Sequence, residues 1–560
     1  MSTAARPILN IVGTLALFLA VLSVPAQTQD QRVPAIRTTT RLVQLNVVVL
    51  DNHKRPVNDL SQSDFQVLDN GREQKLSHFS MSSTPAAGVR SAPEPLVITN
   101  RRGQPGETPG TVTIVLVDEL IDQDARASYY RATLQSIRSQ VQKVLATLGP
   151  GQQVALYELR AEGVVVAQEL TDDPAALIAA VKTIGAGLLK AKYSPVGAKP
   201  ETADGAFSRH VGPAPVRRTS ITEDLRVALV KEAFQGIAHH LQGSPARKNI
   251  VWISTVFPTV VTGFDPGLMA ADRDAINPIP GQMLSVPQFS DPQGHYERLR
   301  ALARQMSNGN ISVYPTDAKG LVLGSVRNLL GERGFMDLLA SETGGRAFYD
   351  VNGVDAPLRE VVEEGRVAYL LGYYPGDGTW DGKYHRVEVK LKRPGLSVLC
   401  RKGYFAADEP LPKDSDDALR DVARGMLEWS GIGVTLNVSS NPLEWLDQEM
   451  VLKLDTQEIH FENKDGRWRA QLDVVFVQLS KDDRILESVK DHAELALLPE
   501  SYSAAVTQGW FYPKTVDVNP KADKLRVVVR DRATGAVGSV SVPVYQPKGV
   551  KSAIHAKGPD

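Results

Sequence analysis

Cysteine is almost absent from the 560-residue chain, which contains only Cys400. An intramolecular disulfide and a cysteine-based metal cluster are therefore both excluded, and Cys400 is expected to be a small buried apolar residue. An excess of charge of either sign is also lacking, because 63 Lys and Arg face 64 Asp and Glu for a net charge of -1. A neutral chain without runs of like charge gives no electrostatic reason to expect nucleic acid or an anionic membrane as a partner.

Long apolar runs are lacking everywhere except near the N-terminus. Arg6 precedes a dense apolar stretch from Leu15 to Val24, and a small-residue cleavage site ends at Ala26. Residues 1–26 are therefore predicted to be a Sec-type signal peptide, with a transmembrane anchor as the alternative. The dense stretch is shorter than the ~20 residues that a membrane-spanning helix needs. We expect a secreted or periplasmic protein with no transmembrane segment in the mature chain.

The first part of the mature chain has the pattern of β structure. Residues 40–80 alternate apolar and polar side chains and contain Asn70-Gly71, the pair favoured in tight two-residue turns. They are predicted to form a small N-terminal β module. Residues 81–110 are rich in Pro, Ser and Gly and are predicted to be a linker.

Helical and strand patterns alternate over residues 111–365. "TVTIVLV", "KNIVWIS" and "ISVYPTD" are apolar runs of strand length, as expected for strands that are buried on both faces of a sheet. Strands that alternate with helices predict a doubly wound, mostly parallel sheet covered on both faces, which is a Rossmann-like α/β domain. Residues 185–218 and 257–290 have little periodicity and are interpreted as insertions.

Beta structure is predicted to return after the α/β domain. Residues 366–406 are predicted to form a β-hairpin extension. Several alternating runs over 415–546, preceded by a short helix, predict a C-terminal β-sandwich, and 547–560 is a tail.

Polar side chains gather where the three apolar strands end. Strands of one direction deliver their carboxyl ends to one edge of an α/β sheet, and ligands bind at that edge. The residues placed there are Asp118, Glu119, Asp122, Asp124, Ser254, Thr255, Thr316 and Asp317. Such oxygen ligands suit Mg²⁺, Mn²⁺ or Ca²⁺. The alternative is that strand-end aspartates cap helices and keep the rim polar.

Several segments, taken in order, carry a family resemblance over about residues 40–406. They are "VVVLDNHKRPVNDLSQSDFQVLDNG", "ARKNIVWIS", "ISVYPTDAKGL", "LASETGGRAFYDVNG", "YLLGYYP" and "DGKYHRVEVKLKRPGLSVLCRKGYF". Together they resemble the von Willebrand factor A-related family typified by secreted acidobacterial proteins. The resemblance implies a Rossmann-like A-type domain with a small N-terminal β module. It implies no established biochemical activity.

The resemblance also implies where a metal ion would bind, and the sequence departs from that pattern. Typical A domains begin the site with Asp-x-Ser-x-Ser after the first strand and complete it with a Thr and an Asp from two later loops. Asp118 matches the leading Asp, but Leu120 and Asp122 replace the serines, and no Asp follows the strand in "STVFP". We expect a degenerate metal-ion-dependent adhesion site, with Asp118, Asp122 and Asp317 as the remaining candidate ligands for Mg²⁺ or Ca²⁺. No other cofactor is expected, and Asp118→Ala is expected to leave fold and partner binding largely unchanged.

Two further motifs are weaker. "DGTWDGKYHRVE", from Asp377 to Glu388, nearly fits the spacing of a calcium-binding EF-hand loop, but its flanks have strand patterns, so a hairpin loop is the alternative. His239 and His240 are neighbours on a predicted helix, so they point apart and are expected to be surface or rim residues. Phosphate-binding loop, nucleophile-elbow and H-E-x-x-H motifs are absent from the sequence.

These observations favour a binding protein over an enzyme. A protein or extracellular matrix partner is expected to contact the long insertions and the rim, which comprises Glu119, Asp124, Ser254, Thr255 and Thr316. One alternative is a divalent-metal-dependent hydrolase that uses Asp118, Asp122 and Asp317. The other is a structural component of the cell envelope.

Overall fold

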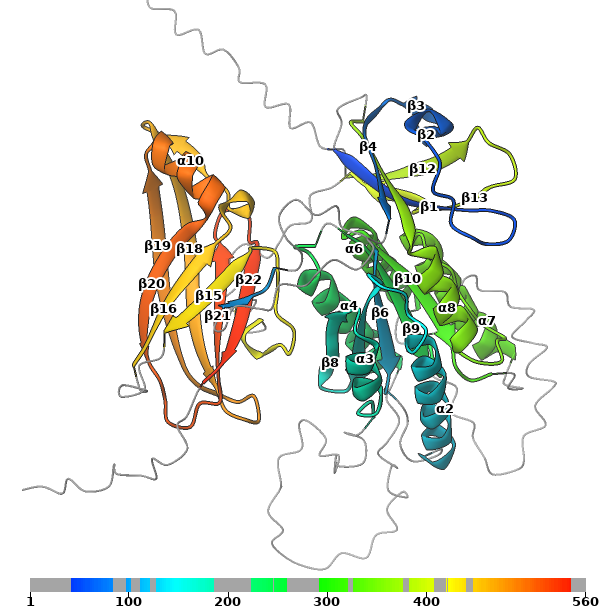
Figure 1. Ribbon diagram of the computed structural model, residues 1–560, viewed down its shortest axis with the longest axis horizontal. Helices are drawn as coiled ribbons and strands as arrows, with labels where there is room; N and C mark the ends of the chain where they lie inside the picture. Colours follow the sequence, from blue (N-terminus) through cyan, green and yellow to red (C-terminus); the bar gives the residue numbers. More distant parts are fainter. Residues whose placement is uncertain are drawn as a thin grey trace, which may run out of the picture. The chain divides into compact units, whose positions relative to one another are not determined.

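A computed structural model gives the structure of the protein and places it among mixed α/β chains with several sheets (Figure 1). It describes residues 42–83, 97–101, 111–120, 127–185, 223–244, 246–258, 292–320, 326–375, 382–406, 419, 422–439 and 447–544. The predicted signal peptide, the tail 547–560, most of both insertions, Asp122 and Asp124 lie outside these ranges. Within them, no helix combines the length and apolar character that crossing a membrane requires.

Residues from both sides of the α/β region build the first β region. Its strands are β1 (Val43–Leu50), β2 (Phe65–Asp69), β3 (Arg72–Gln74), β4 (Leu76–Ser83), β11 (Val367–Tyr373), β12 (Tyr384–Leu391), β13 (Ser397–Leu399) and β14 (Gly403–Phe405). They form two four-stranded sheets, ordered β13-β1-β11-β4 and β14-β12-β2-β3. Each sheet mixes strands from residues 40–80 and 366–406, so these segments form one region and not a separate module and extension. Asn70 and Gly71, with φ of 48° and 80°, make the predicted tight turn between β2 and β3.

A buried polar cluster joins the two halves of this region. The Asp69 carboxylate accepts hydrogen bonds from the hydroxyls of Tyr373 at 2.9 Å and Tyr404 at 2.8 Å, and its other oxygen lies 3.0 Å from His385 Nδ1. All four residues are buried. Burial, with Asp69 acting in the same direction, raises the pKa of both tyrosines, so their hydroxyls stay protonated as donors. We call these residues the Asp69 cluster.

The central sheet has the strand order β10-β9-β6-β7-β8. Its strands are β6 (Thr111–Asp118), β7 (Gln153–Arg160), β8 (Gly163–Thr171), β9 (Arg247–Ser254) and β10 (Ile311–Asp317). The neighbours from β10 to β7 pair in parallel, and β8 pairs antiparallel with β7 at the edge. Parallel strands need crossover connections, and the helices between these strands supply them.

Helices cover both faces of the central sheet. They are α2 (Ala127–Leu145), α3 (Pro174–Val181), α4 (Glu223–His240), α6 (Pro292–Asn308), α7 (Val326–Thr343) and α8 (Asp355–Glu364). Side chains of α4, α6 and α7 share one apolar cluster with the sheet, and side chains of α2, α3 and α8 share the other. Helix α3 begins with a capped first turn, since Asp173 accepts a hydrogen bond from the Ala175 amide and Pro174 takes the first helical position.

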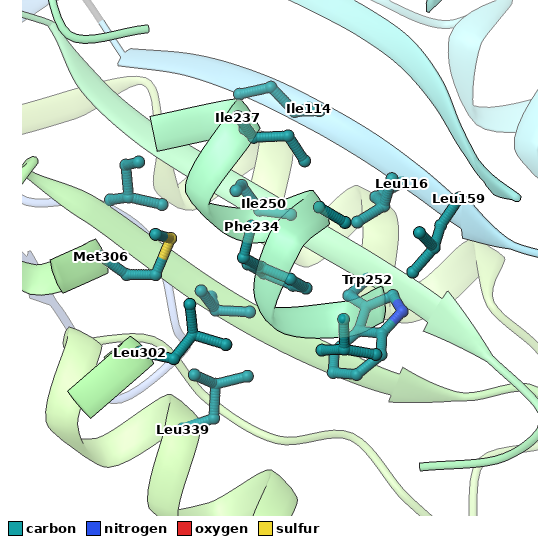
Figure 2. Packing of buried hydrophobic residues seen from close by; sticks show 14 of the residues in the cluster. Ile114, Leu116, Leu159, Phe234, Ile237, Ile250, Trp252, Leu302, Met306 and Leu339 are labelled. Carbon is teal, nitrogen blue, oxygen red and sulfur yellow. The ribbon is translucent and has the colours of Figure 1, made fainter. Parts of the chain in front are cut away.

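Trp252 belongs to the first apolar cluster, together with Phe234 and Ile250 (Figure 2). Its fully buried ring lies edge-on to the rings of Phe234, 5.1 Å away, and Phe257, 4.8 Å away. Edge-to-face contact is a preferred geometry of aromatic pairs and adds to the free energy gained by burying their area. This packing fixes α4 against the carboxyl-terminal half of β9, close to the edge where the candidate site lies.

The C-terminal region has two sheets around a shared apolar core. One sheet contains β5 (Val97–Thr99), β15 (Val434–Ser439), β16 (Asp447–Leu454) and β20 (Trp510–Asp517). The other contains β17 (Glu462–Lys464), β18 (Arg467–Leu479), β19 (Ile485–Leu497), β21 (Lys524–Asp531) and β22 (Val537–Pro543), and α10 (Pro499–Gln508) follows β19. Strand β5 comes from the predicted linker and pairs with β15, so part of 81–110 belongs to this region.

Candidate functional site

The parallel register brings the predicted site residues to one edge of the central sheet. Asp317 of β10 is level with Ser254 of β9, and Asp118 of β6 is level with Leu159 of β7. The described candidates nevertheless separate into three networks, each with its own positively charged side chain.

The first network surrounds Asp118. Its Oδ1 accepts a hydrogen bond from the Leu120 amide at 2.8 Å. Its Oδ2 lies 2.8 Å from the Ser254 hydroxyl and 3.4 Å from Nη1 of Arg226. The Ser254 hydroxyl is also 2.8 Å from the Val256 carbonyl, so its single proton is donated to one of the two oxygens. Both carboxylate oxygens therefore already have partners from the chain.

Arg226 extends this network to three segments of the chain. Its guanidinium donates to the carbonyl of Leu120 after β6 and, at 3.0 Å, to the carbonyl of Val256 after β9. Arg226 itself belongs to the first turns of α4 and is 4% exposed, while Asp118 is also 4% exposed. Burial raises the pKa of Asp118, and the charge of Arg226 and the surrounding donors oppose that rise.

The second network holds a pair of buried carboxyl groups, Glu119 and Glu158. Arg160 Nη2 donates to Glu158 at 2.5 Å, and Arg160 Nε lies 3.4 Å from Glu119. The Gly185 amide also donates to Glu158, at 3.0 Å. Burial and the neighbouring Glu158 raise the pKa of Glu119 to about 8, so Glu119 stays protonated at neutral pH.

The third network surrounds Asp317. Its Oδ1 accepts from the Lys319 amide at 2.9 Å, and Lys319 Nζ lies 3.9 Å from Oδ2 while forming an ion pair with Glu332. Burial raises the pKa of Asp317, and Lys319 acts in the opposite direction. The neighbouring Thr316 is completely buried, and its hydroxyl donates to the Tyr314 carbonyl at 3.2 Å.

The predicted partner-binding rim requires a correction. Glu119, Ser254, Thr255 and Thr316 are between 0% and 7% exposed. These residues follow or end strands in the middle of the sheet, and their side chains are buried. Glu119 lies beside Arg160, Ser254 contacts Asp118, and Thr316 donates to the Tyr314 carbonyl. These four residues are therefore parts of the scaffold and not an exposed contact surface, and Asp124 lies outside the described residues.

The residues around Asp118 do not fit a divalent metal ion. A guanidinium lies beside the carboxylate, and the Leu120 and Val256 carbonyls accept hydrogen bonds from it. Asp317 interacts with Lys319 in a network of its own. Among the described residues, no group of three or more His, Cys, Asp or Glu side chains is arranged to bind a metal. The expectation for Asp118→Ala also changes, because this substitution would leave a buried guanidinium without its carboxylate.

The three cations, Arg226, Arg160 and Lys319, are the residues that sequence reasoning missed. For Arg226, one feature of the sequence could have indicated a role. A positive side chain in the first turns of a helix lies at the end where the helix dipole is unfavourable to it, which suggests a specific partner elsewhere. Its partners Asp118 and Leu120 are more than a hundred positions away, at separations of 108 and 106, and hydrophobic periodicity carries no information about such contacts.

The weaker motifs have structural explanations. Glu388 is an exposed residue in the middle of β12 and lies 3.5 Å from Lys390, while Asp377 is outside the described residues. His240 is buried with Nε2 3.3 Å from Glu169, and the ring of His239 stacks on Trp429 with centroids 3.9 Å apart. The expectation of surface histidines was therefore wrong for His240. Cys400 is a free, half-buried residue whose thiol pKa is raised by burial to about 11.

Comparisons with known proteins give only distant structural similarity. No protein-family model matches the chain, and no curated protein matches it. Similar solved structures include proximal thread matrix protein 1 from the mussel byssus, with 13% identity, a TM-score of 0.23, and coverage of 46% of this chain and 47% of that one. The VWA domain of SpRpn10 has 14% identity and a TM-score of 0.21, over 43% of this chain and 87% of that one. The pilus adhesin SpaC from Lactobacillus rhamnosus GG has 10% identity and a TM-score of 0.26, over 76% of this chain and 54% of that one.

The chain thus spans about half the length of two of these three structures. Structural neighbours include a VWA domain, but scores of this size assign neither a family nor an activity.

Proposed function

We propose that this chain is a secreted or periplasmic binding protein, not an enzyme. In this proposal a Rossmann-like A-type domain, with a C-terminal β-sandwich beside it in the sequence, engages a protein or extracellular matrix partner without a divalent metal. The observation that carries the proposal is the closed network of Asp118, Ser254 and Arg226. It occupies the position at which the A-type resemblance would start a metal motif.

The charge arrangement at the sheet edge supports binding over hydrolysis. A metal-dependent hydrolase needs ligands that leave room for an ion and its water. Asp118, Glu119 and Asp317 instead lie beside Arg226, Arg160 and Lys319 respectively. Each of these carboxyl groups therefore already has a positively charged neighbour within the chain, and the three lie in separate networks and not in one ion-binding group.

The proposal is tested by capturing envelope and extracellular proteins on the immobilised full mature chain, in chelator and in excess Mg²⁺. The matched control is the same chain unfolded before immobilisation. We expect the same proteins to be retained in both conditions and to be absent from the control. Retention that requires Mg²⁺, or no retention above the control, would contradict the proposal.

Secretion has its own test. If residues 1–26 are removed on export, the mature protein begins at Gln27. Intact mass of the protein purified from the producing cell's envelope and medium measures this directly. An exported chain that still begins at Met1 would contradict the predicted cleavage.

A further inference from the structure

The contacts of Arg226 resemble those of a bound cation more than those of an ordinary ion pair. One guanidinium contacts oxygens from two loops, namely the Leu120 carbonyl after β6 and the Val256 carbonyl after β9. It also faces the Asp118 carboxylate at 3.4 Å while it is held by helix α4. A planar guanidinium has five donors in a fixed fork, so it can contact several oxygens at once.

The oxygens around the guanidinium are of the kinds that bind a divalent ion. Asp118 supplies a carboxylate, Leu120 and Val256 supply carbonyls, and Ser254 supplies a hydroxyl that is 2.8 Å from the carboxylate. Carboxylate, carbonyl and hydroxyl oxygens are ligands of Ca²⁺, Mg²⁺ and Mn²⁺. The position is also well enclosed, since Asp118, Ser254 and Arg226 are all at most 4% exposed.

We propose that Arg226 is a built-in cation that replaces a divalent ion and joins the ends of β6 and β9 to helix α4. This inference rests on the proposed function, because it explains how an A-type domain could hold the ends of β6 and β9 in place without metal. It makes Arg226 a positioning residue that acts through the loops it joins. It also predicts that removing the guanidinium would leave a group of oxygens able to bind an ion.

The test uses the full mature chain and four proteins: wild type, Arg226→Ala, Arg226→Lys, and the double variant Asp118→Asn with Arg226→Ala. Thermal unfolding midpoints are measured in chelator and with increasing Mn²⁺. We expect Arg226→Ala to unfold at a lower temperature than wild type in chelator and to regain stability with Mn²⁺. The wild type and the double variant are expected not to respond, because one retains the guanidinium and the other lacks the carboxylate.

Three results would overturn the proposal. The first is a wild type whose unfolding midpoint Mn²⁺ raises, since its guanidinium should exclude the ion. The second is an Arg226→Ala variant as stable as wild type in chelator, and the third is a destabilised Arg226→Ala variant that Mn²⁺ does not rescue. If Arg226→Ala does not fold, Arg226→Lys is used. The proposal expects its unfolding midpoint to be lower than that of wild type, since an ammonium lacks the forked donors of a guanidinium. A midpoint equal to that of wild type would contradict the proposal. No partner is present in this experiment, so its failure is distinguishable from failure of partner capture.

Discussion

Asp118 and Asp69 are both buried aspartates at the end of a strand, but they are stabilised in different ways. Asp118 ends β6 and faces the permanent charge of Arg226, together with one amide and one hydroxyl. Asp69 ends β2 and is held by two tyrosine hydroxyls and a histidine ring. The first arrangement joins loops at the edge of the α/β sheet, and the second joins the two sheets of the first β region.

The difference shows what a strand-end carboxylate in a sequence can and cannot indicate. In "TVTIVLVDEL" the carboxylates suggested a metal site, whereas the aspartate in "FQVLDNG" was part of a hairpin pattern and suggested no site. Both proved to be anchors for polar groups from distant parts of the chain. A permanent cation beside Asp118 makes the charge of that aspartate essential, while the neutral hydroxyls at Asp69 mainly require an acceptor.

The largest loss of unfolding free energy is expected for Asp118→Ala. Removing this carboxylate leaves the buried Arg226 guanidinium uncompensated, which costs about 3–5 kcal/mol of unfolding free energy. Denaturant titration of the full chain measures the loss. The matched control is Asp59→Ala, which breaks an Asp–Arg pair of similar chemistry with Arg393 at the surface, and we expect little change there. Equal losses in the two variants would remove the distinction between buried and exposed pairs.

The next largest effect is expected at Asp69. Asp69→Ala leaves the hydroxyls of Tyr373 and Tyr404 without their acceptor in a buried cluster, at a cost of roughly 2–3 kcal/mol. Tyr404→Phe is the milder control, because it removes a donor and leaves Asp69 with the other partners. If Asp69→Ala costs as much as Asp118→Ala in denaturant titration, the proposed role of permanent charge at Asp118 is wrong.

A pH effect is expected from Glu119. In the folded protein the pKa of Glu119 is raised from the ordinary 4.5 of a glutamate to about 8, so Glu119 keeps its proton up to about pH 8. Between these pH values the unfolded chain releases a proton that the folded chain keeps, so stability falls as pH rises, by up to about 1.4 kcal/mol per pH unit. Glu119→Gln should flatten this part of the profile and be the more stable variant near pH 8. Glu162→Gln, at the adjacent exposed turn, should keep the wild-type profile, and identical profiles for all three proteins would contradict the raised pKa of Glu119.

The smallest effect is expected at Glu388. This carboxylate is exposed on β12 beside Lys390, so Glu388→Gln should change the unfolding free energy by less than about 0.5 kcal/mol. Calorimetry with Ca²⁺ on both proteins should give no difference in heat. A Ca²⁺-binding heat that disappears in the variant would instead restore the calcium interpretation.

Strong local patterns predicted much of the fold. The apolar runs that form β6, β9 and β10 are typical of strands buried on both faces of a sheet, and the structure places them in the central sheet as predicted. Elements with little buried surface were missed. Strand β20 buries only Val516 and contains Pro513, α10 buries only Ala505, and β5 has three residues.

Long-range pairing explains the remaining differences. Nothing local indicates that residues 40–80 share sheets with residues 366–406, because each segment alone has the pattern of a small β unit. The same holds for the site. The strand pattern correctly predicted that Asp118 lies at the carboxyl-terminal edge of the sheet. Its partner Arg226 lies in a separate helix, and only the folded chain brings the two together.

The most direct test of the account is equilibrium unfolding of the wild-type full chain in chelator and in saturating Mg²⁺. An ion that binds only the folded state at a hundred times its dissociation constant would add about 2.7 kcal/mol of stability. Because Arg226 already occupies the position beside Asp118, we predict identical unfolding free energies in the two conditions. Stabilisation by Mg²⁺ that disappears in Asp118→Asn would contradict the account.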